Sequence, residues 1–482
     1  MIPLFSPVIC LLIPFTILLS LRSIKRSSLK VLRISKSGLE RELSFIALMI
    51  ASSDKDPILL LYSLKDSRFL SFSKEVERWQ RLRALGYGPI EAIIKSARTH
   101  PSTIFQEFIN LCLNVHKGLA SRESILDFIL SKYEQRIVHI ETILPSIISL
   151  LPTLVITVPA IIIPTAILAN INPINFLFLT TITSVIAIIL GISILQWMGF
   201  ILNPEMCFQD QVLLLLLIPP LLSIAIAPKL DLFTVLILLP ISTVPISLYI
   251  WYRSKGISLS IDEWITLLRR SIEYSKLTGV PLAVALVRTS HNFLARSKPL
   301  LKFKVLADLS LNEALLRSMD IASSTFLRNL LEATRLLLLF SHESSPLERF
   351  IIHLDRVLKL TKDIKERLRA LRPTLLISLI IYSCILYLSI TTLKAMSSAI
   401  QGGFSSVGAS TIITHNFSSS PIEQLEKYCL LCILISSSSL SLVNALTEDF
   451  SPWAFFKYFP MYSLVALLTY LILNRFVPLG GI

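Results

Sequence analysis

The sequence predicts an all-α, polytopic membrane protein of about eight spans that carries two homologous cytoplasmic helical bundles. The first observation is composition, because 53% of the 482 residues are hydrophobic and only 16% are charged, against about 25% charged in soluble proteins. The second is charge placement, because 20 of the 46 Lys and Arg residues fall in residues 22–142 and 21 in residues 253–372. The third is a helical segment that recurs after 222 positions. Together they exclude a soluble globular protein.

The predicted spans are stretches of about 20 apolar residues, the length needed to cross the hydrocarbon core as a helix. None contains a Lys, Arg, Asp or Glu until the last one ends near Arg475. The first is interpreted as a retained anchor, because its bases follow the apolar stretch, and a cleaved signal peptide is the alternative. The eight spans are Ile2–Leu21, Ile143–Ala169, Phe176–Ile201, Val212–Ala227, Phe233–Tyr252, Thr374–Leu393, Tyr428–Leu446 and Tyr458–Phe476.

Basic residues beside the spans predict the orientation in the membrane, because cytoplasmic flanks are enriched in Lys and Arg. Six bases follow the first span within residues 22–36, and six precede the sixth within residues 359–372, whereas the link Asn170–Asn175 is uncharged. Both charged blocks are therefore expected in the cytoplasm of a multi-pass protein of the cell membrane. The predicted domains are an anchor with a basic segment (1–36), a first bundle (37–142), a four-span region (143–252), a second bundle (253–372) and a C-terminal membrane region (373–482).

The repeated segment reads RALGYGPIEAIIKSA at residues 83–97 and VLADLSLNEALLRSM at residues 305–319. Lys95 and Arg317 occupy matching positions in the two copies. In the second copy, Ser310 and Glu313 form a capping-box pattern, in which each side chain bonds a backbone N–H of the other residue. Glu91 has the matching place after Gly88-Pro89. We therefore predict helix-capping roles for Glu91, Ser310 and Glu313, with a carboxylate that faces a partner as the alternative.

The copies agree elsewhere, since Glu42-Leu43 and Glu263-Trp264 each open an apolar periodic run. With Arg83-Ala-Leu-Gly86, Glu91-Ala92 and the later Gly118, this pattern resembles the type II secretion system protein F family. Members of this family are the membrane platforms of type IV pilus-like machines, including the archaellum and the Tad pilus. The resemblance covers Gly38–Ala169 and Ser258–Leu393, and four spans between the copies are similar to the archaeal members. The second copy departs from the pattern, with Ala307-Asp308 in place of Leu85-Gly86 and no glycine that matches Gly118.

The resemblance implies a non-enzymatic platform that couples a cytoplasmic secretion ATPase to the insertion of pilins into a filament. The implied partners are a hexameric secretion ATPase and pilin-like subunits. We also expect contacts with membrane lipids and a homo-oligomer, a dimer. The expected ATPase contacts are bases placed alike in the two copies, namely Arg81, Arg83, Lys95, Lys302, Lys304 and Arg317.

Other chemistry is not supported by the sequence. A phosphate-binding loop needs glycines followed by Lys, but the chain has 13 glycines and no Gly-Lys pair. The seven histidines include no pair at metal-ligand spacing, and the bases lack the aromatic platform of nucleic-acid sites. We therefore expect no catalytic, cofactor or metal site and no nucleic-acid partner.

A membrane transporter built from two homologous halves is the alternative function. Duplication and proline-interrupted spans favour it. The absence of charged residues inside the spans counts against it, because transported ions and protons need ionisable side chains there.

Overall fold

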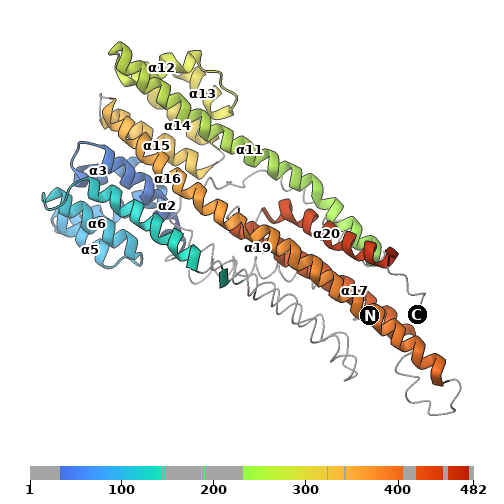
Figure 1. Ribbon diagram of the computed structural model, residues 1–482. Coiled ribbons are helices and arrows are strands. Elements are labelled where there is room, and N and C mark those ends of the chain that lie inside the picture. Colours follow the sequence, from blue (N-terminus) through green and yellow to red (C-terminus); the bar gives the residue numbers. More distant parts are fainter. Residues whose placement is uncertain are drawn as a thin grey trace.

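The computed structural model describes residues 33–142, 232–322, 324–340, 344–404, 419–448 and 454–476, together with 145–146, 186 and 189. Throughout these residues the regular structure is helical, with no strand. Figure 1 shows two groups of shorter helices at the same end of several long helices, which run away from them. The predicted all-α fold class is confirmed for the described part of the chain.

The first group of helices comprises residues 33–142. It begins with α2 (Arg33–Ser52) and ends with a long helix over residues 123–142. Every residue from Glu42 to Ser52 is buried, because α2 packs on its own group and also on α15 and α16 of the second. Between these two helices the chain forms α3 (Pro57–Ser63), the 3-10 helix η2 (Leu64–Asp66), α4 (Leu70–Ala84), α5 (Pro89–Arg98) and α6 (Thr103–His116).

The second group of helices comprises residues 253–369. It begins with the end of α11 (Leu232–Thr278) and finishes with α16 (Ser345–Arg369). The helices between them are α12 (Leu282–Asn292), α13 (Lys298–Leu306), α14 (Leu311–Ile321) and α15 (Thr325–Phe340). The helices of the two groups correspond in chain order. The end of α11 corresponds to α2, and α16 corresponds to the helix 123–142.

Glycines end two helices of the first group. Gly86 follows α4 with φ 94°, and Gly118 follows α6 with φ 73°. Glycine adopts this left-handed conformation without the strain of a Cβ atom. In the second group, α13 instead ends at Ala307, which keeps right-handed helical angles (φ −61°, ψ −31°). The departure of the second copy from the glycine pattern is therefore a different helix ending, which needs no glycine.

Three helical stretches of the described residues are long and apolar enough to cross a membrane, namely Ser345–Thr392, Cys429–Thr447 and Phe455–Arg475. They lie in α16 with α17 (Leu371–Phe404), in α19 (Ser419–Glu448) and in α20 (Phe455–Phe476), and they overlap the last three predicted spans. The predicted span Phe233–Tyr252 forms the start of α11, which continues past Pro240 and Pro245. The other four predicted spans lie outside the described residues, apart from 145–146, 186 and 189.

The helix α19 is the centre of the apolar part. Every residue from Cys429 to Thr447 is buried, and α19 packs against α17 and α20 and, less extensively, against α11 and α16. The outer helices expose large apolar side chains, including Ile377 and Leu388 of α17 and Leu468 and Ile472 of α20. A buried central helix inside helices with exposed apolar faces is the arrangement expected of a membrane protein.

Two long helices connect the second group to the apolar part. The helix α11 has 47 residues and, at 1.5 Å per residue, is about 70 Å long. The helices α16 and α17 follow one another with only Ala370 between them. Figure 1 shows α11, and α16 with α17, running from the second group into the apolar part, where α17 extends further than α11. The second group is therefore fixed to rigid helices on two sides.

Candidate functional site

Each group contains one acidic side chain that caps a helix far away in sequence. The Glu42 carboxylate accepts hydrogen bonds from the backbone N–H groups of Ser71 (3.0 Å) and Phe72 (2.8 Å) at the start of α4. The Glu263 carboxylate accepts from Arg296 and Ser297, each at 2.9 Å, just before α13. The first N–H groups of a helix have no partner within it. Glu42 supplies that partner for two N–H groups in the first turn of α4, whereas Glu263 bonds Ser297, the N-cap residue of α13, and Arg296 before it.

Glu42 lies in an apolar environment that affects its ionisation. Burial raises the pKa of Glu42 to about 7, although the hydrogen bonds from Ser71 and Phe72 and the charge of Lys74 favour the ionised form. Desolvation disfavours a charged carboxylate. The cap on α4 therefore titrates near neutral pH.

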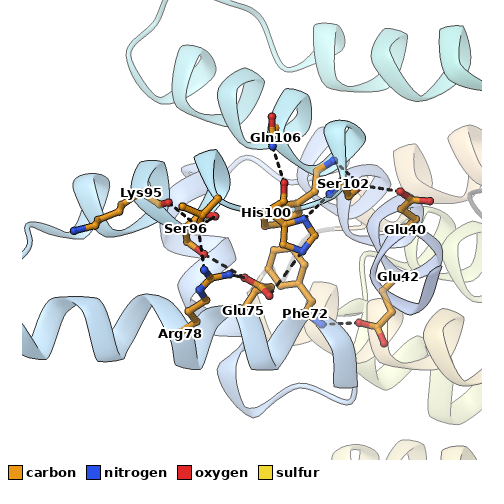
Figure 2. Close-up of polar contacts among 12 residues, drawn as sticks. Glu40, Glu42, Phe72, Glu75, Arg78, Lys95, Ser96, His100, Ser102 and Gln106 are labelled. Atoms are coloured by element: carbon orange, nitrogen blue, oxygen red, sulfur yellow. Dashed lines mark hydrogen bonds and ion pairs between the residues drawn. The ribbon is translucent and has the colours of Figure 1, made fainter. Parts of the chain in front are cut away.

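A cluster of polar side chains lies between α2, α4, α5 and α6 in the first group, as Figure 2 shows. Glu75 accepts a hydrogen bond from Ser96 Oγ (3.2 Å), and its other oxygen is 3.8 Å from His100 Nε2. His100 Nδ1 accepts from the backbone N–H of Ser102 (3.1 Å), and Ser102 Oγ donates to Glu40 (2.7 Å). Hydrogen bonds thus link α4 to α5 and α2 to the N-cap of α6, and the 3.8 Å contact between Glu75 and His100 lies between these two links.

This geometry does not activate a nucleophile. Both serine hydroxyls donate to carboxylates, whereas an activated serine donates to a basic nitrogen. Burial lowers the pKa of His100, and the nearby Arg78 lowers it further, against the raising effects of Glu75 and of Glu40. The cluster is a set of buried hydrogen bonds that fixes the turn between α5 and α6.

The second group lacks this cluster. At the offset of 222 positions, Ala322 stands in place of His100, so the histidine of the cluster is missing. Ser324 matches Ser102, and its buried Oγ has no hydrogen-bond partner within the described residues. The two groups therefore share the helix order and the distant glutamate cap, but only the first has the polar cluster.

A buried acid of the second group accepts a hydrogen bond from the backbone of the first group. Glu332 of α15 has a side chain that is 0% exposed, and Arg335 bonds both of its oxygens, at 2.7 and 2.8 Å. The same carboxylate accepts a hydrogen bond from the backbone N–H of Arg68 in the first group, at 2.9 Å. Because this carboxylate is fully buried, its hydrogen bonds take the place of the water molecules that would solvate it in the unfolded chain.

Further contacts surround this ion pair along the same interface. Phe45 of α2 packs edge-on against Phe326, with ring centroids 5.1 Å apart. Arg349 binds both carboxylate oxygens of Asp54 at 2.8 Å. The interface also contains the pairs Arg68–Asp320 (3.5 Å), Lys55 over the Phe340 ring (5.0 Å) and Arg367–Glu141. The interface therefore combines apolar packing with charge pairs of complementary sign.

The predicted caps are formed only in part. Glu91 accepts from the Gly88 N–H at 3.1 Å, but Gly88 has no side chain to return the bond. Ser310 Oγ accepts from the Glu313 N–H at 3.3 Å. Glu313 does not reach back to Ser310, because its carboxylate binds Arg317 at 3.1 Å one turn later. Each copy thus keeps one half of the predicted box, and the capping prediction for Glu313 needs that correction.

Three of the six predicted contact bases are held by neighbouring side chains. Lys95 lies over the Tyr87 ring, 3.9 Å from its centroid, and bonds its hydroxyl. Arg83 lies 5.7 Å from the Tyr62 ring centroid, and Arg317 pairs with Glu313. Within the described residues, no partner is found for Arg81, Lys302 or Lys304. Of these three, Arg81 and Lys302 are exposed and Lys304 is half-buried.

The bases of the two copies do not form one patch. Figure 1 shows α5, which carries Lys95, on the opposite side of the two groups from α13, which carries Lys302 and Lys304. The structure thus places each set on its own group. The exposed apolar residues Leu301 and Val305 accompany the α13 lysines.

No cofactor or metal chemistry is apparent in the described part of the chain. No cluster of three His, Cys, Asp or Glu residues that could hold a metal is found there. Burial raises the pKa of the Cys112 thiol well above its ordinary value, so this thiol stays protonated. Comparison with known proteins finds no matching family model, no matching curated protein and no matching solved structure.

Sequence reasoning missed the roles of three acids. Glu42 and Glu263 were noted only as openings of apolar runs, although their matching positions were a usable signal. Glu332 left no signal, because an acid three residues before Arg335 reads as an ordinary surface pair.

Proposed function

We propose that this chain is the non-enzymatic membrane platform of a type IV pilus-like machine, such as an archaeal pilus, an archaellum or a type II secretion system. In this role it couples a cytoplasmic secretion ATPase to the insertion of pilin-like subunits. The observation that carries the proposal is the pair of helical groups with the same helix order, joined by the hydrogen bond from the Arg68 backbone to buried Glu332 and fixed to apolar helices.

The connection between the groups and the apolar helices supports a mechanical role. A force applied to the second group is transmitted through α11 and through α16 and α17, because neither path contains a flexible loop. The first group follows, since its α2 packs on α15 and α16. The two groups are then cytoplasmic homologous bundles, in a multi-pass protein of the cell membrane with about eight spans, which acts as a homodimer.

The buried helix α19 bears on the transporter alternative. Its serines are the main polar residues of the apolar part, and a transporter would direct such groups at a substrate. Instead, Ser437, Ser438 and Ser439 donate to carbonyls of their own helix at 2.8 to 2.9 Å. These hydroxyl donors are therefore taken up by the helix backbone and are not free to donate to a substrate.

The test is affinity purification of the tagged full chain from its native membrane, followed by mass spectrometry and an ATPase assay. We expect a hexameric ATPase with a phosphate-binding loop and small proteins with one N-terminal apolar helix. The chain alone should hydrolyse no ATP. Recovery of neither partner, with substrate uptake by proteoliposomes of the pure chain, would support the transporter instead.

A further inference from the structure

Two helices of the apolar part begin with a base beside the same aromatic ring. Arg372 is the second residue of α17, and its guanidinium carbon is 5.7 Å from the Tyr458 ring centroid. Lys457 is the third residue of α20, and its Nζ lies 4.8 Å from that centroid and 3.0 Å from the Tyr458 hydroxyl. Tyr458 is buried and both bases are half-buried. Two cations therefore converge on one buried ring.

A third helix reaches the same level. The Ser247 hydroxyl of α11 lies 3.4 Å from the carbonyl oxygen of Lys457 and donates to it. One turn further along α11, the exposed Trp251 lies under Lys255, whose Nζ is 5.0 Å from the ring centroid. Aromatic rings with bases beside them mark the boundary between hydrocarbon and headgroups.

The charge pattern of the sequence places the same boundary here. In α17, no charged residue follows Arg372 until Lys394, and in α20 none follows Lys457 until Arg475. In α11, no charged residue precedes Arg253. The three helices thus change from charged to apolar at one level, where lipid headgroups lie.

The bases at this level suit an anion. Within the described residues, neither Arg372 nor Lys255 makes an ion pair, and Arg372 is partly held by a 3.3 Å contact to Met461 Sδ. A guanidinium binds phosphate oxygens through two parallel N–H bonds, and a lysine ammonium adds a point charge. Basic side chains between spanning helices on the cytoplasmic side are a known arrangement for anionic headgroups.

We propose that Arg372 and Lys457, arranged around Tyr458 between α17 and α20, bind the phosphate of an anionic phospholipid headgroup. The proposal requires that α17 and α20 cross the membrane, but it does not depend on the pilus-like function. The lipid would join the first turns of the two helices. Its headgroup belongs to the same side of the membrane as the two helical groups.

The experiment is native mass spectrometry of the full chain in detergent, titrated with phosphatidylglycerol, phosphatidylcholine or inorganic phosphate. We expect retention of phosphatidylglycerol over phosphatidylcholine. The double variant Arg372→Gln/Lys457→Gln should bind phosphatidylglycerol about 30-fold more weakly. Each of the two bases is expected to contribute about equally to the attraction for the anionic headgroup, and the variant loses both contributions. Arg372→Lys keeps the charge and should retain most of the binding.

The matched control is Lys65→Gln/Lys117→Gln, which removes two exposed bases of the first group and should leave lipid binding unchanged. Elution as a single species in size-exclusion chromatography shows that each variant is folded. If the double variant misfolds, the single variant Arg372→Gln is tested for weaker lipid binding. Loss of phosphatidylglycerol from the wild type at high salt is then the second measurement. Equal retention of both lipids by the wild type, or unchanged binding by the folded variant, overturns the proposal. Competition by millimolar inorganic phosphate would instead identify a free-phosphate site.

Discussion

The carboxylate of Glu332 accepts a hydrogen bond from the backbone N–H of Arg68, which lies 264 positions earlier in the chain. The same carboxylate is held by Arg335 of its own helix. A single buried acid thus fixes the turn before α4 against α15. The attachment of the first group to the second depends on this acid more than on the exposed pairs around it, because a buried charge that loses its partners cannot be solvated.

Replacing Glu332 with Ala should destabilise the chain strongly. Removing one member of a buried pair costs about 3–5 kcal/mol, since Arg335 would remain charged with a side chain only 12% exposed. The matched control is Glu313→Ala, which removes an exposed pair in α14 worth about 0.5 kcal/mol. Thermal unfolding of the detergent-solubilised protein measures both. Similar small shifts for the two variants would contradict the structural role given to Glu332.

Glu42 makes the stability of the chain depend on pH. Its pKa is raised from 4.5 to about 7 in the folded chain, so between these values the folded state binds the proton that the unfolded state has lost. Its contribution is therefore largest at low pH and declines as pH rises from 4.5 to 7, by about 3 kcal/mol in total. Glu42→Gln removes this titration and retains a carbonyl acceptor for α4.

The measurement for Glu42 is the difference in unfolding temperature between the wild type and Glu42→Gln across pH 4.5–8. We expect the unfolding temperature of the variant to rise relative to that of the wild type as pH increases from 4.5 through 7, and the difference to level off toward pH 8. A difference that stays constant across this range would show that Glu42 ionises as it does in the unfolded chain.

His100 should make the stability of the chain depend on pH in the opposite direction, with stability lost as pH falls. Its pKa is lowered by burial below the ordinary 6.5, so the unfolded chain takes up a proton first as pH falls. The contribution of neutral His100 is present above pH 6.5 and is lost below it. His100→Asn keeps an acceptor for the Ser102 N–H and removes the titration. Unfolding temperatures at pH 5 and 7.5 should show the variant gaining on the wild type at the lower pH only.

The local signals of the sequence predicted the helices well. Pro89 and Ser310 marked the starts of α5 and α14, which begin at Pro89 and Leu311. These signals succeed because a cap and an apolar period involve residues within four positions of each other. The stretch Phe233–Tyr252 is helical, as its apolar character predicts, because it forms the start of α11.

Contacts between distant segments could not be predicted in this way. Glu313–Arg317 and Glu332–Arg335 both read as ordinary helix-surface pairs, yet the Glu313 side chain is 58% exposed and that of Glu332 is 0% exposed. The difference in exposure comes from α2, which packs over α15. The sequence around Glu313 or Glu332 does not indicate this contact. The same holds for the cluster around His100, whose members lie on different helices. A single sequence gives periodicity along a helix, but not the partner that covers it.

The proposed orientation of the chain predicts which positions are accessible from each side of the membrane. Single cysteines in a cysteine-free background at Lys117 and Lys276 should be protected from an impermeant thiol reagent in intact cells. Cysteines at positions 172 and 410 should react. Both lysines are exposed in the helical groups, so burial does not explain their protection, and permeabilised cells provide the control. Labelling of position 117 in intact cells would contradict the proposed topology.

The last prediction concerns docking of the ATPase, and it depends on which bases are available. Lys95 and Arg317 were matched by the repeat, but Tyr87 and Glu313 already hold them. Lys302 is exposed beside Leu301 and Val305 and has no partner within the described residues. Charge reversal at a complementary surface costs several kcal/mol through like-charge repulsion, about the same as a hundredfold or greater loss of affinity.

We therefore expect Lys302→Glu to abolish co-purification of the secretion ATPase and filament assembly, while the protein remains folded in the membrane. Lys117→Glu, an equal reversal at an exposed base of the first group, is the control and should retain both. Arg81→Glu, a reversal at an exposed base of α4, tests separately whether the first group also contacts the ATPase. Normal filaments from Lys302→Glu would show that the α13 lysine is an ordinary solvated charge. The ATPase contact would then have to lie on another surface of the two groups.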